Sequence, residues 1–356
     1  MKICFLGDGN SIHIRRWLDF FHHRGHEVHL ITFSEVNLNH IIVHKTGNFN
    51  IDINGNNWKY IYSTMEIKKL IKKINPQIIN AHFVTSYGFI AALAGAKPLV
   101  VSAWGTDILV TPNRNKVYKA ITKYALNKAK LVTSDSSFMS EAIHVLTNTE
   151  VLTVPMGVES SLCYEDRKES ADEIRILSLR TVNKNSNIHI IVKAFAELLK
   201  TNKDNNFRLI ITNDGPEMET IKALVKDLNL EKNVDIKGFV SREVLLELLF
   251  TSHMFVTIPD SDSTSVTLLE AMASGITTIA SDIPANREWI NHKENGLLTE
   301  NIDDVSLKFC MDYALNNLEF KQKAAILSRK IILDKAIWTD NMSSVEQKYL
   351  ELIKSR

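Results

Sequence analysis

The feature that most constrains this chain is a repeated alternation of short apolar segments and amphipathic segments. Near the start, residues 3–6 and 28–33 are predicted strands, and residues 12–23 between them have helical spacing. Two strands joined by a helix form a βαβ unit, which requires a parallel sheet and a right-handed crossover. Because the alternation runs along most of the 356 residues, the sequence predicts an α/β fold of doubly wound type.

The alternation comes in two series, separated by a polar stretch at residues 160–173. The first series continues with predicted strands at 78–81, 99–102, 131–133 and 151–154, whereas 41–62 is expected to be irregular or hairpin-like. The second series has predicted strands at 174–179, 208–212, 234–237, 254–258 and 277–280, with helical stretches between them. This length suits two domains. We expect domains at 1–160 and 161–333, and a C-terminal helix at 334–356 that packs back toward the first.

Composition excludes several classes of protein. A formal net charge of +1 argues against a dedicated nucleic-acid binder, which carries a strong basic excess. Cys4, Cys163 and Cys310 are far apart and form no CxxC pair, so neither a disulfide framework nor a zinc site is indicated. No apolar stretch is long enough to cross a bilayer. We therefore expect a cytoplasmic protein, with the inner face of the cell membrane as one place where it could act.

A glycine-containing turn directly follows the first predicted strand. Gly9 and Asn10 open the first helix there, where backbone amides and the helix dipole suit an anion. The dinucleotide-binding fingerprint is incomplete, because Ile12 stands where its third glycine belongs. A tight turn at the edge of another nucleotide-sugar site is the better interpretation.

The most informative segment is residues 261–275, where an acidic, hydroxyl-rich loop leads into a helix. Free N–H groups at the helix start suit phosphate or sugar oxygens, and two carboxylates, Asp262 and Glu270, bracket the loop. Paired carboxylates can hold vicinal sugar hydroxyls. From position alone, however, a capping Asp262 and a solvated Glu270 are the simpler interpretation.

The order of motifs decides between these interpretations. Residues 269–275 read Leu-Glu-Ala-Met-Ala-Ser-Gly and are followed by a buried strand, Glu288 and Asn295-Gly296. Together with 15–18, 24–28, 81–88, 102–107 and 155–158, the segment resembles family-four retaining glycosyltransferases (glycosyl transferases group 1) along nearly the whole chain. That resemblance implies the GT-B fold, which is two Rossmann-like doubly wound domains with a cleft between them.

The chain departs from the family pattern at four places. The first acid is Asp262 where Glu is usual, and 263–265 replace Gly-Phe-Gly. Lys184 is displaced by one residue from the family's diphosphate-binding lysine and lacks its glycine. Trp104 stands where many relatives have a histidine.

The resemblance implies a metal-independent hexosyltransferase without a cofactor, acting on a nucleotide-diphosphate sugar, with a UDP-sugar favoured. Arg180, Lys184 and Asp262 are the expected catalytic residues. The expected donor-binding residues are Gly9, Asn10, Asp214, Gly238, Phe239, Val240, Ser263, Thr264, Ser265, Val266 and Glu270. The expected acceptor-binding residues are His13, His82, Trp104 and Asp107.

The expected acceptor is a glycan or lipid-linked glycan in surface polysaccharide biosynthesis. Lysines at 68–73 and across 114–130, interleaved in the second stretch with Val117, Tyr118, Ile121 and Tyr124, suggest peripheral contact with an anionic membrane. A solvated helix face is the simpler alternative. Two other functions stay open: a nucleotide-sugar epimerase of the same architecture, and a catalytically weakened binding or scaffold subunit.

Overall fold

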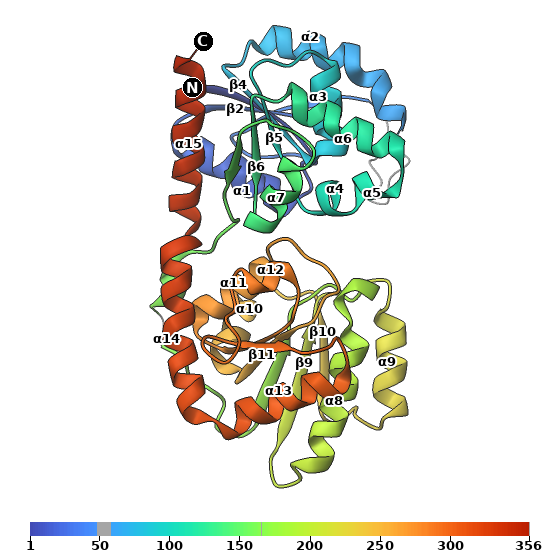
Figure 1. Cartoon of the computed structure of the whole chain (residues 1–356), viewed down its shortest axis with the longest axis vertical. Coiled ribbons are helices and arrows are strands. Elements are labelled where there is room, and N and C mark those ends of the chain that lie inside the picture. Colours follow the sequence, from blue (N-terminus) through green and yellow to red (C-terminus); the bar gives the residue numbers. More distant parts are fainter. Residues whose placement is uncertain (48–57, 165, 356) are drawn as a thin grey trace. The chain divides into compact units, whose positions relative to one another are not determined.

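The structure is a computed structural model that describes residues 1–47, 58–164 and 166–355 (Figure 1). The chain divides into two compact units. The first contains Met1–Pro155 together with Asp340–Arg356, and the second contains Met156–Thr339. Each unit has its own parallel β-sheet and its own hydrophobic core.

The first unit is built on a seven-stranded parallel sheet with the order β3-β2-β1-β4-β5-β6-β7. Its strands are β1 (Lys2–Leu6), β2 (Glu27–Thr32), β3 (Ile42–Lys45), β4 (Ile78–His82), β5 (Leu99–Ser102), β6 (Leu131–Ser134) and β7 (Val151–Thr153). Its helices are α1 (Ile12–His23), α2 (Thr64–Ile74), α3 (Phe89–Leu93), α4 (Thr106–Leu109), α5 (Thr111–Arg114), α6 (Lys116–Lys128) and α7 (Ser137–His144). Short turns of 3-10 and π type cover Trp58–Ser63 and Phe83–Gly88.

The segment 41–62 corrects one expectation. Its described part is no hairpin, because β3 pairs with β2 in parallel, with Ile31 opposite His44. A short, half-exposed edge strand carries little hydrophobic patterning, so its sequence looked irregular. Residues 48–57 of this segment lie outside the described residues.

The second unit has a six-stranded parallel sheet with the order β10-β9-β8-β11-β12-β13. Its strands are β8 (Ile174–Ser178), β9 (Phe207–Thr212), β10 (Val234–Gly238), β11 (Met254–Thr257), β12 (Thr277–Ser281) and β13 (Leu297–Thr299). Its helices are α8 (Ile188–Thr201), α9 (Met218–Asp227), α10 (Arg242–Thr251), α11 (Val266–Ser274), α12 (Pro284–Arg287), α13 (Asp304–Asn316) and α14 (Leu318–Lys335), with 3-10 turns at Ser160–Cys163 and Lys184–Ser186. The expected strands are all present, and β13 is an addition of only three residues.

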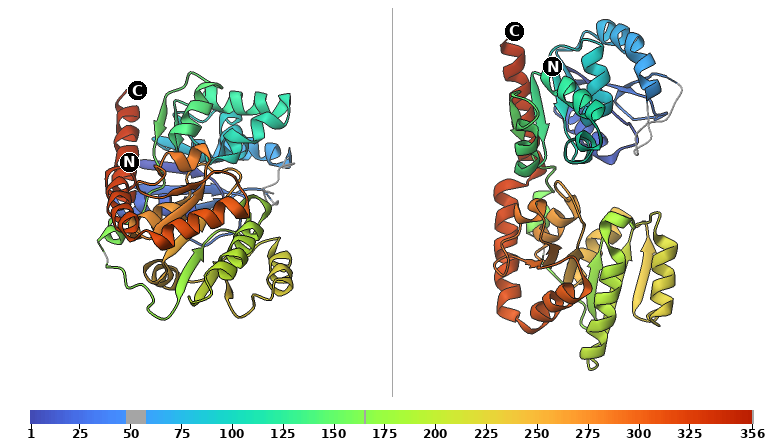
Figure 2. Two further views of the ribbon diagram at one scale, coloured as in Figure 1. Left: turned by 60° about the horizontal axis from the view of Figure 1, so that its bottom comes forward. Right: turned by 45° about the vertical axis from the view of Figure 1, so that its right-hand side comes forward.

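Helices cover both faces of each sheet (Figure 2). In the second unit, α8, α9 and α13 contribute to one core, while α10 and α11 contribute to the core on the opposite face. In the first unit, α2, α3, α6 and α7 pack on one face of the sheet. Parallel strands buried on both faces are the architecture of a doubly wound fold, as the sequence predicts.

The last helix, α15 (Trp338–Lys354), belongs to the first unit from Asp340 onward. Its Tyr349 is fully buried and stacks on Phe21 of α1, with ring centroids 5.4 Å apart. Its Glu346 accepts hydrogen bonds from Arg24 at 2.9 Å and from His26 at 2.6 Å. A buried carboxylate with two partners from the α1–β2 turn therefore fixes this helix to the first unit.

Replacing Glu346 with Gln should destabilise the protein near neutral pH by about 1–3 kcal/mol, because it removes charge-assisted hydrogen bonds. Burial raises the pKa of Glu346, but the hydrogen bonds and charges of Arg24 and His26 outweigh it, so the net pKa is lowered. A carboxylate whose pKa is lower in the folded than in the unfolded state stabilises the fold at pH values above its unfolded-state pKa. That stabilisation is lost as pH falls through the folded-state pKa.

Urea unfolding from pH 7 down to about pH 3.5 measures this difference, which should shrink below the ordinary Glu pKa of about 4.3. Glu351→Gln is the matched control, since Glu351 is on the same helix and its side chain is half-exposed. That control should change stability by no more than about 0.5 kcal/mol. A difference for Glu346→Gln that stays constant over this pH range would contradict the prediction.

Candidate functional site

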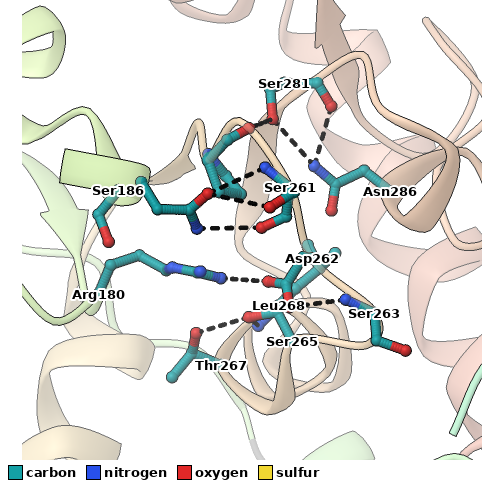
Figure 3. Close-up of polar contacts among 12 residues, drawn as sticks. Arg180, Ser186, Ser261, Asp262, Ser263, Ser265, Thr267, Leu268, Ser281 and Asn286 are labelled. Carbon is teal, nitrogen blue, oxygen red and sulfur yellow. Dashed lines mark hydrogen bonds and ion pairs between the residues drawn. The ribbon is translucent and has the colours of Figure 1, made fainter. Parts of the chain in front are cut away.

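Two loops at the carboxyl edge of the second sheet are joined by an ion pair. Arg180 follows β8, and Asp262 lies in the segment between β11 and α11. Because β8 and β11 are neighbours in the sheet, the Arg180 guanidinium donates to the Asp262 carboxylate (Figure 3). Both side chains are largely buried, at 16% and 20% exposure. A cation and an anion expected to act together are therefore in direct contact.

Two asparagines hold the loop that carries Lys184 against the loop after β11. The Asn185 amide donates to the Ser261 carbonyl at 3.0 Å, and the Ser261 N–H donates back to Asn185 at 3.1 Å. Asn187 donates to the Ile258 carbonyl at 3.1 Å and has a left-handed φ of 51°. The Lys184 side chain itself is exposed. The loop is therefore fixed while its lysine extends into solvent.

The start of α11 offers backbone donors beside this ion pair. Ser265 caps the helix and accepts a hydrogen bond from the Leu268 N–H at 3.4 Å, and the first turn contains no acidic residue. Asp262 accepts the Ser263 N–H at 2.9 Å, and Ser263 and Thr264 are buried. The N-terminal end of a helix attracts anions, so the loop from Asp262 to Val266 suits a phosphate group.

Glu270 is not a solvated helix residue, although its position allowed that interpretation. It is 6% exposed on the buried face of α11. Its carboxylate forms an ion pair with Arg242, the first residue of α10. No sequence pattern indicated Arg242 as a site residue, because the pair joins two helices whose contact depends on packing.

The loops after β9 and β10 complete this edge. Asp214, exposed after β9, accepts the Val182 N–H through its carbonyl at 3.1 Å. A Cβ at Gly215 would lie 2.2 Å from the Val182 carbonyl oxygen, so only glycine lets this turn approach the loop that follows Arg180. Gly238, with a φ of 64°, ends β10, and Phe239 after it is 78% exposed. Val240 is half-buried beside them.

In the first unit, three of the predicted residues form an aromatic cluster. The His13 and His82 rings lie 5.2 and 5.4 Å from the Trp104 ring. Trp17, which was not among the predicted site residues, packs edge-on against His82 with ring centroids 4.9 Å apart. Burial and, to a smaller degree, the neighbouring His13 lower the pKa of His82 to about 3, so this imidazole is neutral at physiological pH.

Asp107, in α4, is fully buried. Its carboxylate accepts the N–H of Val84 at 2.7 Å and that of Trp104 at 3.0 Å. Burial raises the pKa of Asp107 to about 6, an effect that these backbone hydrogen bonds partly offset. The aspartate therefore holds the backbone on which Trp104 is presented.

Gly9 and Asn10 belong to the first unit, whereas the other predicted donor residues belong to the second. The Gly9 N–H donates to Thr32 at 3.2 Å, and a Cβ at Gly9 would meet the Val36 side chain at 2.6 Å. Asn10 is exposed. The glycine is thus required by close packing of the turn.

Residues 1–47, 58–164 and 166–355 lack two features that would indicate other classes of protein. Over these ranges, no group of three or more His, Cys, Asp or Glu side chains could hold a metal ion. Among the helices described, none is long and apolar enough to cross a membrane.

Comparison with known proteins identifies the family. A model described as glycosyl transferase 4-like matches residues 2–136, and one described as glycosyl transferases group 1 matches residues 165–330. The chain belongs to the group 1 glycosyltransferases. Its two parallel-sheet, Rossmann-like units are those of GT-B glycosyltransferases, as the sequence predicts.

Three proteins illustrate how this glycosyltransferase relates to others. The N-acetyl-alpha-D-glucosaminyl L-malate synthase of Bacillus anthracis is 25% identical over 307 residues, which are 78% of this chain and 76% of that enzyme. The alpha-monoglucosyldiacylglycerol synthase of Streptococcus pneumoniae is 25% identical over 162 residues, 42% of this chain and 36% of that enzyme. The crystal structure of Anabaena HepE in complex with UDP superposes with a TM-score of 0.82 at 16% identity, covering 99% of this chain and 100% of that one. The likeness to HepE concerns the fold alone.

Proposed function

We propose that this glycosyltransferase transfers a sugar from a UDP-sugar to a hydroxyl of a glycan or lipid-linked glycan, with retention of anomeric configuration. The observation that carries the proposal is the Arg180–Asp262 pair beside the N-terminal end of α11. The arrangement offers a fixed cation and backbone donors for a diphosphate, with carboxylates for sugar hydroxyls in the same segment.

In the proposed reaction, the bond between the anomeric carbon and the diphosphate oxygen breaks, and both its electrons stay on the diphosphate. A bond forms between the anomeric carbon and the acceptor oxygen, and the departing phosphate takes the acceptor proton. Negative charge therefore grows on the diphosphate in the transition state. A fixed guanidinium aimed at that charge stabilises it without a metal ion, and such terms are among the largest in catalysis.

The main candidates in the second unit have the following roles in this proposal. Arg180 binds the diphosphate, and the exposed Lys184 is the second cation. Asp262 receives a sugar hydroxyl and Glu270 receives the ribose hydroxyls. The base lies along the backbone of Gly238–Val240, beside Asp214.

The names of two related enzymes support retention. The names of the Bacillus and Streptococcus relatives both specify alpha-linked products. UDP-glucose and UDP-N-acetylglucosamine carry an alpha bond at the anomeric carbon, so an alpha product from such a donor means retention. A UDP donor is also supported by the complex of HepE with UDP.

We assign the acceptor to the first unit, where the half-buried rings of His13 and Trp104 offer aromatic faces for a sugar ring. His82 is only 1% exposed, so it supports Trp104 from within and does not touch the acceptor. Asp107 acts there through the backbone of Trp104. A lipid-linked acceptor is supported by the monoglucosyldiacylglycerol synthase, whose named product is a glycolipid.

A donor screen followed by a release assay tests the proposal. Among UDP-, GDP- and ADP-sugars, a UDP-sugar should raise the melting temperature, because it binds only the native state. UDP should then be released when acceptor is present, the product should be the alpha anomer, and chelator should leave the rate unchanged. A free epimerised sugar nucleotide would favour the epimerase alternative, and binding without any turnover would favour the scaffold alternative. Activity lost to chelator and restored by magnesium would overturn the metal-independent mechanism.

We also propose reversible contact between the first unit and an anionic membrane. Helix α3 packs against both α2 and α6, which carry exposed lysines at 68, 69, 72, 73, 116, 119, 123 and 128. Val117 and Tyr124 on α6 are 55% and 38% exposed, whereas Ile121 is buried in the core and cannot contribute. Lysines near an anionic leaflet contribute about 1 kcal/mol each, so a few are enough for reversible attachment.

Vesicle sedimentation measures this contact. Binding should appear with phosphatidylglycerol vesicles at low salt, fade as salt rises, and weaken in a Lys119→Glu, Lys123→Glu variant. A Lys222→Glu, Lys226→Glu variant on α9 of the second unit is the control. A protein that ignores anionic vesicles at low salt would contradict the proposal and favour a soluble acceptor.

A further inference from the structure

The ion pair between Arg242 and Glu270 connects two separate parts of the candidate donor site. We propose that Arg242 is a positioning residue, which holds the Glu270 carboxylate ready for the ribose hydroxyls and so sets the preference for ribonucleotides over deoxyribonucleotides. This inference rests on the proposed function, because it assumes that a nucleotide donor binds at Glu270.

Burial makes the partner of Glu270 important. The residue is 6% exposed, and its neighbours Leu268, Leu269, Ala271 and Met272 on α11 are buried in the apolar core. A carboxylate in such surroundings is stable only with a charged or hydrogen-bonded partner. Arg242 supplies that charge.

Arg242 is well placed to orient the carboxylate as well as to neutralise it. Its backbone is fixed at the start of α10, where Ser241 caps the helix and Leu248, Leu249 and Phe250 pack in the core. Its side chain is 44% exposed, so one end of the guanidinium stays in water while the other reaches the acid. A planar guanidinium restricts the orientation of the carboxylate that it binds.

Asp262 and Glu270 are thus held by arginines that follow two different strands. Asp262 pairs with Arg180, which follows β8, whereas Glu270 pairs with Arg242, which follows β10 and Gly238–Val240. In a nucleoside diphosphate, the ribose is the covalent link between base and diphosphate. An arginine that couples the loop proposed for the base to the acid proposed for the ribose matches that order.

Comparing UDP with an analogue that lacks the ribose hydroxyls shows whether Arg242 positions Glu270 or only supports the structure. In wild type, UDP should bind at least about tenfold more tightly than 2′,3′-dideoxy-UDP. The dideoxy analogue lacks both ribose hydroxyls and so cannot form the charge-assisted hydrogen bonds to Glu270. In Arg242→Ala this ratio should shrink to about two- to threefold, since Glu270 is no longer held toward the hydroxyls. A merely structural role would weaken both ligands by the same factor and leave the ratio unchanged.

Calorimetric titration of the whole protein with UDP and 2′,3′-dideoxy-UDP tests the proposal, with circular dichroism to verify folding. Arg242→Lys should give an intermediate ratio, because it keeps the charge and loses the planar fork. Arg287→Ala is the matched control, since Arg287 forms an exposed ion pair with Asp282 in the same unit. It should bind both ligands as wild type does.

Two results would overturn the assignment of Arg242, and they differ in what else they overturn. If wild type prefers UDP but both Arg242 variants keep the full ratio, Arg242 has no positioning role and the proposed donor site stands. The proposed site and this inference fail together in two cases. In the first, wild type binds UDP and its dideoxy analogue equally; in the second, it binds none of UDP, dideoxy-UDP, ADP and GDP.

Discussion

Arg180→Ala should lower turnover by about 10²- to 10³-fold, the loss seen when a fixed group that stabilises transition-state charge is removed. The guanidinium is needed mainly when charge has grown on the leaving diphosphate, so kcat should fall more than donor affinity. Steady-state rates of UDP release, with donor affinity measured separately, distinguish these two effects.

The fold should tolerate the change, because the Asp262 side chain that loses its partner is 20% exposed and can be hydrated. Arg287→Ala serves as the control and should keep full activity, since its ion pair is at the surface. Arg180→Lys should recover part of the rate through its charge. Turnover near that of wild type in a folded Arg180→Ala protein would refute the assignment of Arg180 to the diphosphate.

Glu270→Ala should weaken donor binding by about 10²-fold, because a charged hydrogen bond contributes about 1.5–3 kcal/mol and the ribose offers two hydroxyls. Glu270→Gln keeps the shape and should lose about tenfold, since an amide forms weaker bonds than a carboxylate. In both variants Arg242 loses its anion but stays hydrated through its exposed end. Titration with UDP provides the measurement.

Glu197→Gln is a suitable control for Glu270, because Glu197 is a half-exposed carboxylate near the end of α8, in the same unit but outside the family motif. It should retain donor affinity within about threefold. Donor affinity unchanged in a folded Glu270→Ala protein would show that the ribose binds elsewhere.

Most of the fold could be predicted because its signals are local. The apolar runs at Leu99–Ser102 and the helix Ile12–His23 have the bounds that their patterns predict, since strand and helix periodicity is written in adjacent residues. Strand β3 was missed because a short edge strand buries little apolar surface. Strand β13, three residues at the edge of the second sheet, was also missed.

The sequence predicts that the candidate residues lie at one edge of the sheet, because loops that follow parallel strands meet at the same edge. Which side chains pair with them could not be predicted. Arg180 meets Asp262, 82 residues away, only because β8 and β11 are neighbours in a sheet whose order differs from chain order. Arg242 reaches Glu270 only because α10 packs on α11.

The same division applies to the end of the chain. Its helical pattern is local, but the contact of Glu346 with His26, 320 residues away, depends on which surface of the first unit the helix covers. Local patterns state which residues are helical and which are buried. The choice of partner for a charged side chain depends on the strand order and helix packing that bring distant segments together, and only the tertiary structure contains that information.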